Sequence, residues 1–266
     1  MVGHVEWVEF LRVPHLPAPG EILHATEWWA EPAGGGAVAA VQLRKLAGSV
    51  DFFTALGDDE LGHRAFEQLS GSLGVRMHAA WRDEPQRRAV TFVDVHGERT
   101  ITVVGDRIVP RGRDPLPWPE LEHADGVYFT GGDVDALRAA RGARVLTATP
   151  RTLETLREAH VRLDALVGSG RDPGERYDPA DLEPRPALLV ATLGQEGGVI
   201  DPGGRFAPAP LPGPLVDTYG AGDSFAAGLT YGLAAGMNAQ EAVALASRCG
   251  AAALTGRGAF AGQLGL

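Results

Sequence analysis

Short apolar segments alternate with segments of helical periodicity along most of the chain. Runs typical of buried parallel strands cover residues 50–56, 126–130, 144–148, 164–167 and 187–193. Helical patterns lie at residues 36–46, 60–72, 134–141 and 152–160, and two alanine-rich helices are expected near 221–235 and 239–255. This alternation predicts an α/β fold in which helices cover both faces of a mostly parallel sheet.

Two stretches have the period of two that is typical of half-exposed strands. Residues 88–95 and 99–104 flank a His-Gly turn, and residues 5–13 and 21–29 flank a proline-rich turn. We expect these segments, within about 5–30 and 88–104, to form a small sheet beside the main domain. Such a sheet is either a solvated flap or a lid over a substrate. Its exposed edges, expected at residues 5–13 and 88–95, give a physical reason for pairing with a second subunit.

The composition narrows the function classes. A chain of 266 residues that is 44% hydrophobic suits one domain over residues 1–266. The net charge of −10 argues against nucleic acid or a membrane as partner. The lone cysteine, Cys249, forms no internal disulfide, and no Cys/His spacing resembles a zinc site. Without a signal-peptide pattern or a long apolar run, we expect a cytoplasmic protein.

Residues 217–225 give the clearest indication of a catalytic site. Three small residues enter a helix, which leaves the N–H groups of its first turn accessible to an anion such as a transferring phosphoryl group. Asp223 follows directly and can take a proton from an attacking hydroxyl. Alternatively, Asp223 only complements the helix dipole.

These residues match, at every defined position, the pattern Asp-Thr-x-Gly-Ala-Gly-Asp-x-Phe. The pattern resembles the C-terminal signature of the ribokinase-like (PfkB) carbohydrate and nucleoside kinases. The resemblance implies a three-layer α/β/α sandwich with a β-sheet lid, and ATP-dependent phosphorylation of a hydroxyl on a small molecule. The acceptor would be a sugar or sugar-like compound, with a nucleoside as the alternative. The implied catalytic residues are the base Asp223 and the anion hole of Gly220, Ala221 and Gly222.

Other family landmarks occur in the same order along the chain. The implied substrate-side glycines are Gly34, Gly35 and Gly36, at the start of a helix. The implied ATP-binding residues are Thr192, Gly194, Gly197 and, near adenine, Ser247. The family's Asn-x-x-Glu segment, which is tied to Mg²⁺ and phosphate, is replaced by residues 169–172, where Asp172 keeps an acid that can serve Mg²⁺. The resemblance also allows K⁺ near the backbone of residues 217–218 and a homodimer through the lid.

The substrate side departs from the sugar kinases of the family. Val8 and Ala39 stand where two polar sugar contacts are expected. Glu6, on the same strand face as Val8, can replace the lost carboxylate. Nucleoside bases can stack on one of the tryptophans at positions 7, 28 and 29. Few basic residues lie near the expected site, which argues against a sugar phosphate, although Arg88 or Arg107 can bind one.

Two rival functions remain. The first is a dinucleotide-dependent oxidoreductase, because the spacing Gly34-x-Gly36-x-x-Ala39 fits a loose dinucleotide-binding fingerprint. That fingerprint should follow a core strand directly, and the preceding residues are not a core strand. A P-loop NTPase is excluded, because the sequence has no Walker A motif around its one lysine, Lys45. A ligand sensor that has lost turnover is motivated by Val8 and Ala39, whereas an intact base beside an anion hole argues for an enzyme.

Overall fold

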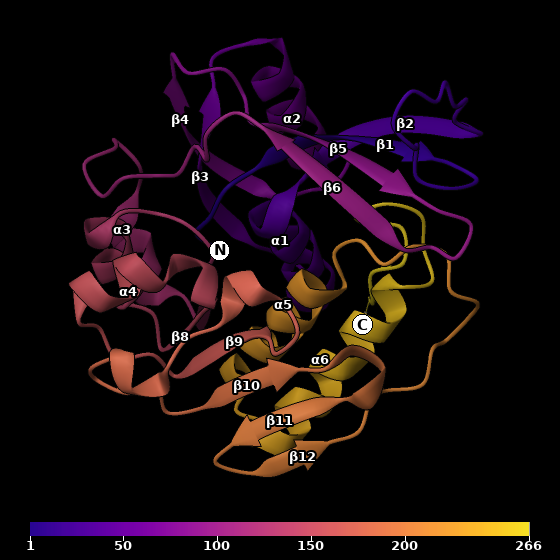
Figure 1. Cartoon of the computed structure of the whole chain (residues 1–266). Coiled ribbons are helices and arrows are strands. Elements are labelled where there is room, and N and C mark those ends of the chain that lie inside the picture. Colours follow the sequence, from indigo (N-terminus) through magenta and orange to yellow (C-terminus); the bar gives the residue numbers. More distant parts are fainter. Residues whose placement is uncertain (266) are drawn as a thin grey trace.

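A central sheet brings together both halves of the chain in the computed structural model, which describes residues 1–265 except the side chain of Pro179 (Figure 1). Its strands are β3 (Asp51–Gly57), β4 (Arg76–Arg82), β7 (Gly126–Phe129), β8 (Val145–Ala148), β9 (Ala165–Ser169), β10 (Leu189–Thr192), β11 (Gly198–Asp201) and β12 (Gly204–Phe206). Six of them run in the order β12-β11-β10-β9-β8-β7, and β3 pairs with β4. Val2 joins the two parts because it bridges both Phe53 and Phe129.

The sheet is parallel apart from one edge. β3 with β4, and β7 through β10, pair in parallel, whereas β11 pairs antiparallel with β10 and with β12. The five buried strands predicted from the apolar runs are confirmed. The sequence patterns did not indicate β4, β11 or β12. These strands are mostly half-exposed or short and so lack the continuous apolar run of a buried strand.

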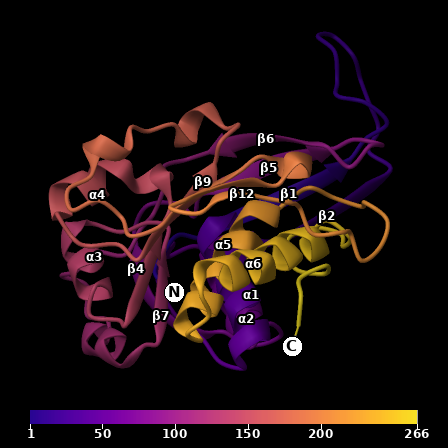
Figure 2. The ribbon, with the colours of Figure 1, turned by 90° about the horizontal axis from the view of Figure 1, so that it is seen from below.

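Helices cover both faces of this sheet (Figures 1 and 2). They are α1 (Gly34–Ala47), α2 (Glu60–Ser70), α3 (Val134–Ala140), α4 (Leu153–Ala159), α5 (Ala221–Ala234) and α6 (Ala239–Ala253). Tyr128 and Val190 pack into a core with α1 and α5, whereas their chain neighbours Val127 and Leu189 pack into a core with α3 and α4. The predicted three-layer α/β/α architecture is therefore confirmed. In the described part of the chain, no helix has the length and apolar character needed to cross a membrane.

A separate four-stranded sheet forms the lid. Its strands are β1 (Glu6–Arg12), β2 (Glu27–Ala33), β5 (Arg88–Val93) and β6 (Arg99–Val104). The order β2-β1-β5-β6 confirms the predicted small sheet, but the expected edges are wrong. β1 and β5 pair with each other in parallel, so the free edges belong to β2 and β6. This contact joins residues about 80 positions apart, and local turn patterns carry no information about it.

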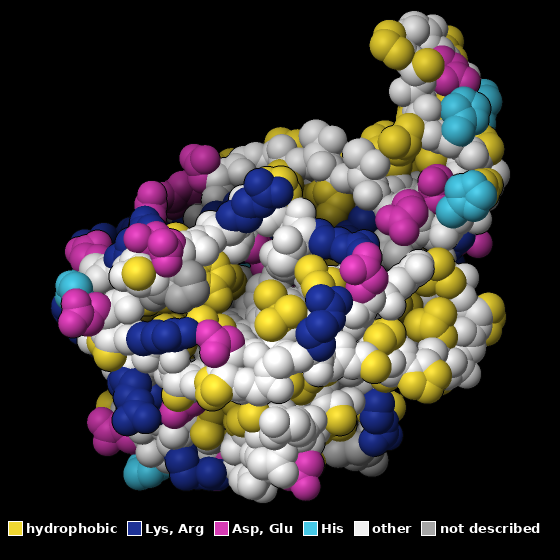
Figure 3. All heavy atoms as spheres, turned by 60° about the horizontal axis from the view of Figure 1, so that its bottom comes forward, with side chains coloured by type: hydrophobic (Ala, Val, Ile, Leu, Met, Phe, Trp, Pro, Cys, Tyr) yellow, Lys and Arg dark blue, Asp and Glu magenta, His cyan; other side chains and the backbone are white. Residues whose placement is uncertain are grey.

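The second lid strand also begins later than expected. The sequence pattern placed it at residues 21–29, whereas β2 starts at Glu27 and leads directly into α1. The preceding residues 13–26 include no strand and stand out from the body as a loop (Figures 2 and 3).

The lid touches the segment that leads into α5. The Thr218 N–H and hydroxyl both donate to the Gly97 carbonyl at 3.1 Å, and Arg99 Nη1 donates to the Thr218 carbonyl at 2.7 Å. On the inner side of the lid, the Phe10 ring packs edge-on against Tyr219, with ring centroids 4.9 Å apart. The Tyr219 hydroxyl in turn accepts the Gly34 N–H at 3.2 Å. The β1–β2 lid, the start of α1 and the entry to α5 therefore meet at one place.

Candidate active site

The N-terminus of α5 forms an open turn. Gly220 precedes the helix with φ 74°, a left-handed conformation that favours glycine, and a Cβ there would lie 2.9 Å from Val38 Cγ1. Gly222 is exposed and has no neighbour within 4 Å of the place where a Cβ would be. Because the first N–H groups of a helix have no partner within it, residues 220–222 present donors to the space in front of the helix. This arrangement is compatible with an anion site, and the anion hole itself stays a prediction.

Asp223 lies against the first turn of α1. A Cβ on Gly35 would sit 2.8 Å from Asp223 Oδ1, and a Cβ on Gly36 would sit 2.3 Å from the His4 carbonyl. Side chains at these positions would displace the carboxylate or the N-terminal strand. The glycines at the start of α1, together with Gly34, thus let two helix N-termini approach each other. The structure brings the predicted base and the predicted substrate-side glycines together.

Burial raises the pKa of Asp223 to about 6, and the negative charge of Glu175 adds to this effect. The positive charges of Arg99 and Arg151 act in the opposite direction. A carboxylate with a pKa near 6 holds a proton more readily than an ordinary aspartate and is still ionised at neutral pH. These are the properties of a general base that accepts a proton during a reaction.

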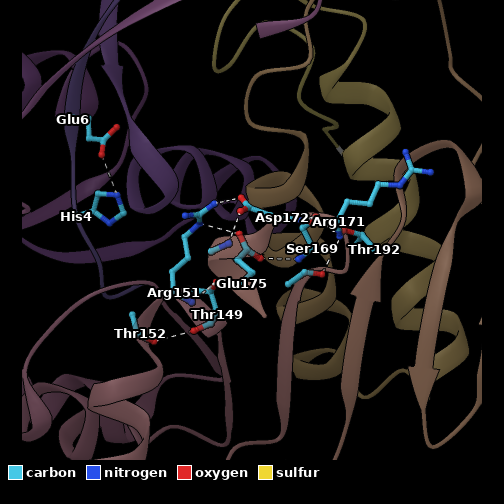
Figure 4. Close-up of polar contacts among 12 residues, drawn as sticks. His4, Glu6, Thr149, Arg151, Thr152, Ser169, Arg171, Asp172, Glu175 and Thr192 are labelled. Carbon is cyan, nitrogen blue, oxygen red and sulfur yellow. Dashed lines mark hydrogen bonds and ion pairs between the residues drawn. The ribbon is translucent and has the colours of Figure 1, made fainter. Parts of the chain in front are cut away.

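Glu175 is the acid that sequence reasoning missed. Its Oε2 accepts the Ser169 N–H at 2.6 Å, and its Oε1 lies 2.8 Å from Arg151 Nε (Figure 4). It follows Ser169 by six residues, so the Asn-x-x-Glu spacing did not find it. Both Ser169 and Arg151 lie at or just after the carboxyl ends of parallel strands, where ligands of open α/β sheets bind, and this is the signal that can reveal the region.

Asp172, which the sequence suggested as an acid for Mg²⁺, contacts an arginine and a backbone N–H group. One oxygen pairs with Arg151 Nη2, and the other accepts the Gly174 N–H at 2.8 Å, which caps the short turn Pro173–Glu175 (Figure 4). Of the two acids, Glu175 has the larger effect on the pKa of Asp223. Asp172 is thus engaged with Arg151 and with its own turn, whereas the charge of Glu175 reaches Asp223.

Glu6 lies on the other side of the glycine turn. It is buried, its Oε1 is 2.9 Å from Arg87 Nε and 3.7 Å from His4 Nε2, and its Cγ is 3.0 Å from the place of a Cβ on Gly34. Burial raises the pKa of Glu6, and the charges of Arg87 and Arg107 oppose this rise. Glu6 is thus at the expected substrate side, together with Arg107, which was considered from the sequence, and with His4 and Arg87, which were not.

The tryptophans considered for base stacking have other neighbours. Trp7 lies under the Arg64 guanidinium of α2, 4.6 Å from the ring centroid. Trp29 stacks on Phe10 with centroids 4.9 Å apart, and Trp28 is 65% exposed. Their contacts are those of lid packing and surface rather than of a pocket beside Asp223.

The predicted nucleotide residues follow the carboxyl end of β10. Thr192 ends the strand, and Gly194 and Gly197 frame a single helical turn with φ 61° and 77°. The Ser247 hydroxyl, on α6, accepts the Ala209 N–H at 2.9 Å and so ties the 207–216 segment to that helix. The first three residues lie beside Ser169, because β9 and β10 are neighbours and Thr192 pairs with Ser169.

Comparisons with known proteins agree with this geometry. The sequence profile described as pfkB family carbohydrate kinase matches residues 1–161 and 163–263. The ATP-dependent ribose-1-phosphate kinase of Halopiger xanaduensis is 28% identical over 269 residues, which cover 94% of this chain and 89% of that protein. A fructokinase of Klebsiella pneumoniae is 29% identical, over 86% of this chain and 87% of its own.

Solved structures show the same fold. The ribokinase of Thermotoga maritima superposes with a TM-score of 0.78 at 22% identity, covering 99% of this chain and 95% of that one. With the family profile matched over almost the whole length and its signature folded around Asp223, the chain belongs to the pfkB family of carbohydrate kinases.

Proposed function

We propose that this protein is an ATP-dependent kinase that phosphorylates a hydroxyl of a sugar-like compound, with Asp223 as the base. The observation that carries the proposal is the position of Asp223, beside an open helix N-terminus and against the glycine turn of α1. A ligand sensor has no use for a base with a raised pKa at this place. ATP is a cytoplasmic co-substrate, so we also place the enzyme in the cytoplasm, which cell fractionation can test.

The chemistry follows from the arrangement of the two helix N-termini. The acceptor oxygen attacks the γ-phosphorus of ATP, a new P–O bond forms, and the bond to the ADP oxygen breaks. The hydroxyl proton passes to Asp223. The N–H groups of Gly220, Ala221 and Gly222 stabilise the charge on the transferring phosphoryl group, and the helix dipole acts in the same direction. The nucleotide would lie along Thr192, Gly194 and Gly197, with Ser247 toward its base.

A divalent cation fits the acids beside the anion hole. When no cation lies nearby, burial and the negative charge of Glu175 raise the pKa of Asp223. Carboxylate oxygens are the ligands that Mg²⁺ prefers, often through water. We propose that Glu175 holds the Mg²⁺ of Mg·ATP, with Asp172 fixing the orientation of Arg151. The bound ion would neutralise phosphate charge during transfer.

A monovalent cation fits Asp217. This carboxylate is fully buried and accepts the N–H groups of Tyr219 at 2.8 Å and Gly258 at 3.1 Å. Because a buried charge needs compensation, K⁺ near residues 217–218 would stabilise the entry to α5. Higher activity in K⁺ than in a bulky organic cation at equal ionic strength would support this site.

The nucleoside alternative lacks an aromatic platform. Trp7, Trp28 and Trp29 pack elsewhere, whereas His4 and Glu6 offer polar groups beside the glycine turn. Such groups suit the hydroxyls of a sugar, so sugar-like acceptors are the better candidates.

We also propose a homodimer formed through the lid. The β6 edge strand is exposed along its whole length, and Ile101 and Val103 are 40% and 43% exposed. A second copy of this face would cover these apolar side chains and the free edge.

The kinase proposal is tested by a screen of ATP consumption with Mg²⁺ and K⁺ against sugars, sugar phosphates and nucleosides. We expect turnover with a sugar-like acceptor, and we expect Asp223→Asn to lower kcat by about 10²–10⁴-fold because the base is lost. ATP affinity, measured by calorimetry, should stay within about twofold. A variant that keeps its kcat within tenfold of wild type would contradict the role of Asp223.

The pKa of Asp223 sets the pH dependence. The base works only when it is ionised, so kcat/KM should be constant above the pKa of about 6 and fall about tenfold per pH unit below it. The residual activity of Asp223→Asn should lack this decline. A flat profile between pH 5 and 7 in a protein that stays folded by circular dichroism would argue against Asp223 as the base.

The two acids that pair with Arg151, Glu175 and Asp172, allow a matched test of the Mg²⁺ site. Glu175→Gln should raise the Mg²⁺ concentration for half-maximal activity by about 10–100-fold, because a ligand or its immediate partner is lost. Asp172→Asn, which changes the same charge, should shift it by less than about threefold. The reverse ranking in these titrations would make Asp172 the metal acid.

The dimer is tested by light scattering coupled to size exclusion. We expect wild-type protein at twice the monomer mass and Ile101→Asp at the monomer mass, since a charge would be buried at the interface. Val199→Asp, at a side chain that is 36% exposed on β11, is the control and should leave the mass unchanged. A monomeric wild-type protein at micromolar concentration would refute the proposal.

A further inference from the structure

The region beside Gly34 contains more positive charge than a neutral sugar requires. Arg87 comes just before β5, and Arg107 follows β6, yet both charges act on His4 and on Glu6. Arg87 is in contact with Glu6, and its side chain is only 15% exposed. Two segments of the lid thus bring arginines to the same place, on the Glu6 side of the glycine turn.

One carboxylate, Glu6, faces both arginines, so their two positive charges are only partly balanced. Arg151, the third arginine of the region, pairs with both Asp172 and Glu175 (Figure 4). On the other side, Glu6 pairs with Arg87 at 2.9 Å, and the charge of Arg107 acts on the same carboxylate. Burial and the charge of Arg87 lower the pKa of Arg107, so the two guanidiniums repel each other. A second anion in this region would relieve that repulsion.

Several buried polar atoms in this region have no partner. In the described part of the chain, Arg107 Nε, His4 Nδ1 and Thr130 Oγ1 are buried without a hydrogen-bond partner, whereas Arg87 Nε lies 2.9 Å from Glu6 Oε1. His4 is only 6% exposed and hydrogen-bonds to the backbone of Thr130. Buried polar atoms are seldom left unpaired, and an unpaired group points to a missing ligand or water. Guanidinium N–H groups match the oxygens of a phosphate in geometry as well as in charge.

The glycine turn connects this region to the base. The place of a Cβ on Gly34 is 3.0 Å from Glu6, and that on the next residue, Gly35, is 2.8 Å from Asp223. A small ligand that lies over the two glycines therefore reaches both ends. The phosphates of ATP belong at the α5 end, whereas the charge of Arg107 acts on His4 and Glu6 at the other end.

We propose that the acceptor is a sugar phosphate, whose phosphate ester is bound by Arg87 and Arg107 while its free hydroxyl faces Asp223. The proposal rests on the kinase function and names its substrate class. It replaces the expectation from sequence that too few basic residues lie near the site. Arg88, the other arginine considered there, points to Glu9 at 3.0 Å and is outside this region.

The test compares ribose 1-phosphate, ribose 5-phosphate and fructose 6-phosphate with their parent sugars. We expect wild-type kcat/KM to be at least tenfold higher for one of the phosphates than for its parent. Arg107→Gln should raise the KM of that phosphate about tenfold or more and leave the KM of ATP within twofold, whereas Arg107→Lys should have an intermediate KM. Arg88→Gln, a control outside this region, should change neither constant.

Three results would overturn the proposal. A preference for the parent sugars that Arg107→Gln leaves unchanged would exclude the phosphate subsite while keeping the kinase. A rise in the KM of ATP instead of the acceptor would assign these arginines to the nucleotide. If no acceptor is turned over, calorimetry on Asp223→Asn with the same phosphates decides: binding that Arg107→Lys restores and Arg107→Gln abolishes supports the subsite, and absence of binding refutes it.

Discussion

The close approach of two helix N-termini is the constraint on which the site depends. No Cβ fits on Gly35 without displacing Asp223, and no Cβ fits on Gly220 without meeting Val38 of α1. The first turns of α1 and α5 can therefore share one small space, with N–H donors on one side and a carboxylate on the other. The lid adds to the same contact, because Tyr219 bonds Gly34 and packs against Phe10. A single packing arrangement therefore positions the glycine turn of α1, the base Asp223 and the lid.

Charge is divided along this space in two parts. Near the anion hole, Arg151 is shared between Asp172 and Glu175, and burial together with the charge of Glu175 raises the pKa of Asp223. Beyond the glycine turn, the excess is positive, from Arg87 and Arg107. The charge of the first part suits the phosphoryl donor ATP with its Mg²⁺, and the charge of the second part suits an anionic phosphoryl acceptor. The two groups of charged side chains lie on different sides of the glycine turn, so the acids of one group do not cancel the arginines of the other.

Much of this arrangement could be predicted from the sequence, because it depends on local patterns. Continuous apolar runs identified the parallel strands, and the residues before Asp223 identified the helix entry together with the family. The rest depends on long-range contacts. The parallel pairing of β1 with β5 places Arg87 beside Glu6, and no spacing along the chain records it. Glu175 was missed for a related reason. It follows Ser169 by six residues instead of the three of the family pattern, and its side chain folds back to accept the Ser169 N–H.

The most direct test is a crystal structure of the protein with Mg²⁺, a non-hydrolysable ATP analogue and the acceptor found by the screen. We expect the γ-phosphoryl oxygens within hydrogen-bond distance of the N–H groups of residues 220–222, and the acceptor hydroxyl within hydrogen-bond distance of Asp223. A nucleotide whose phosphates lie away from the α5 N-terminus, or an acceptor whose hydroxyls do not reach Asp223, would contradict the assignment of this site.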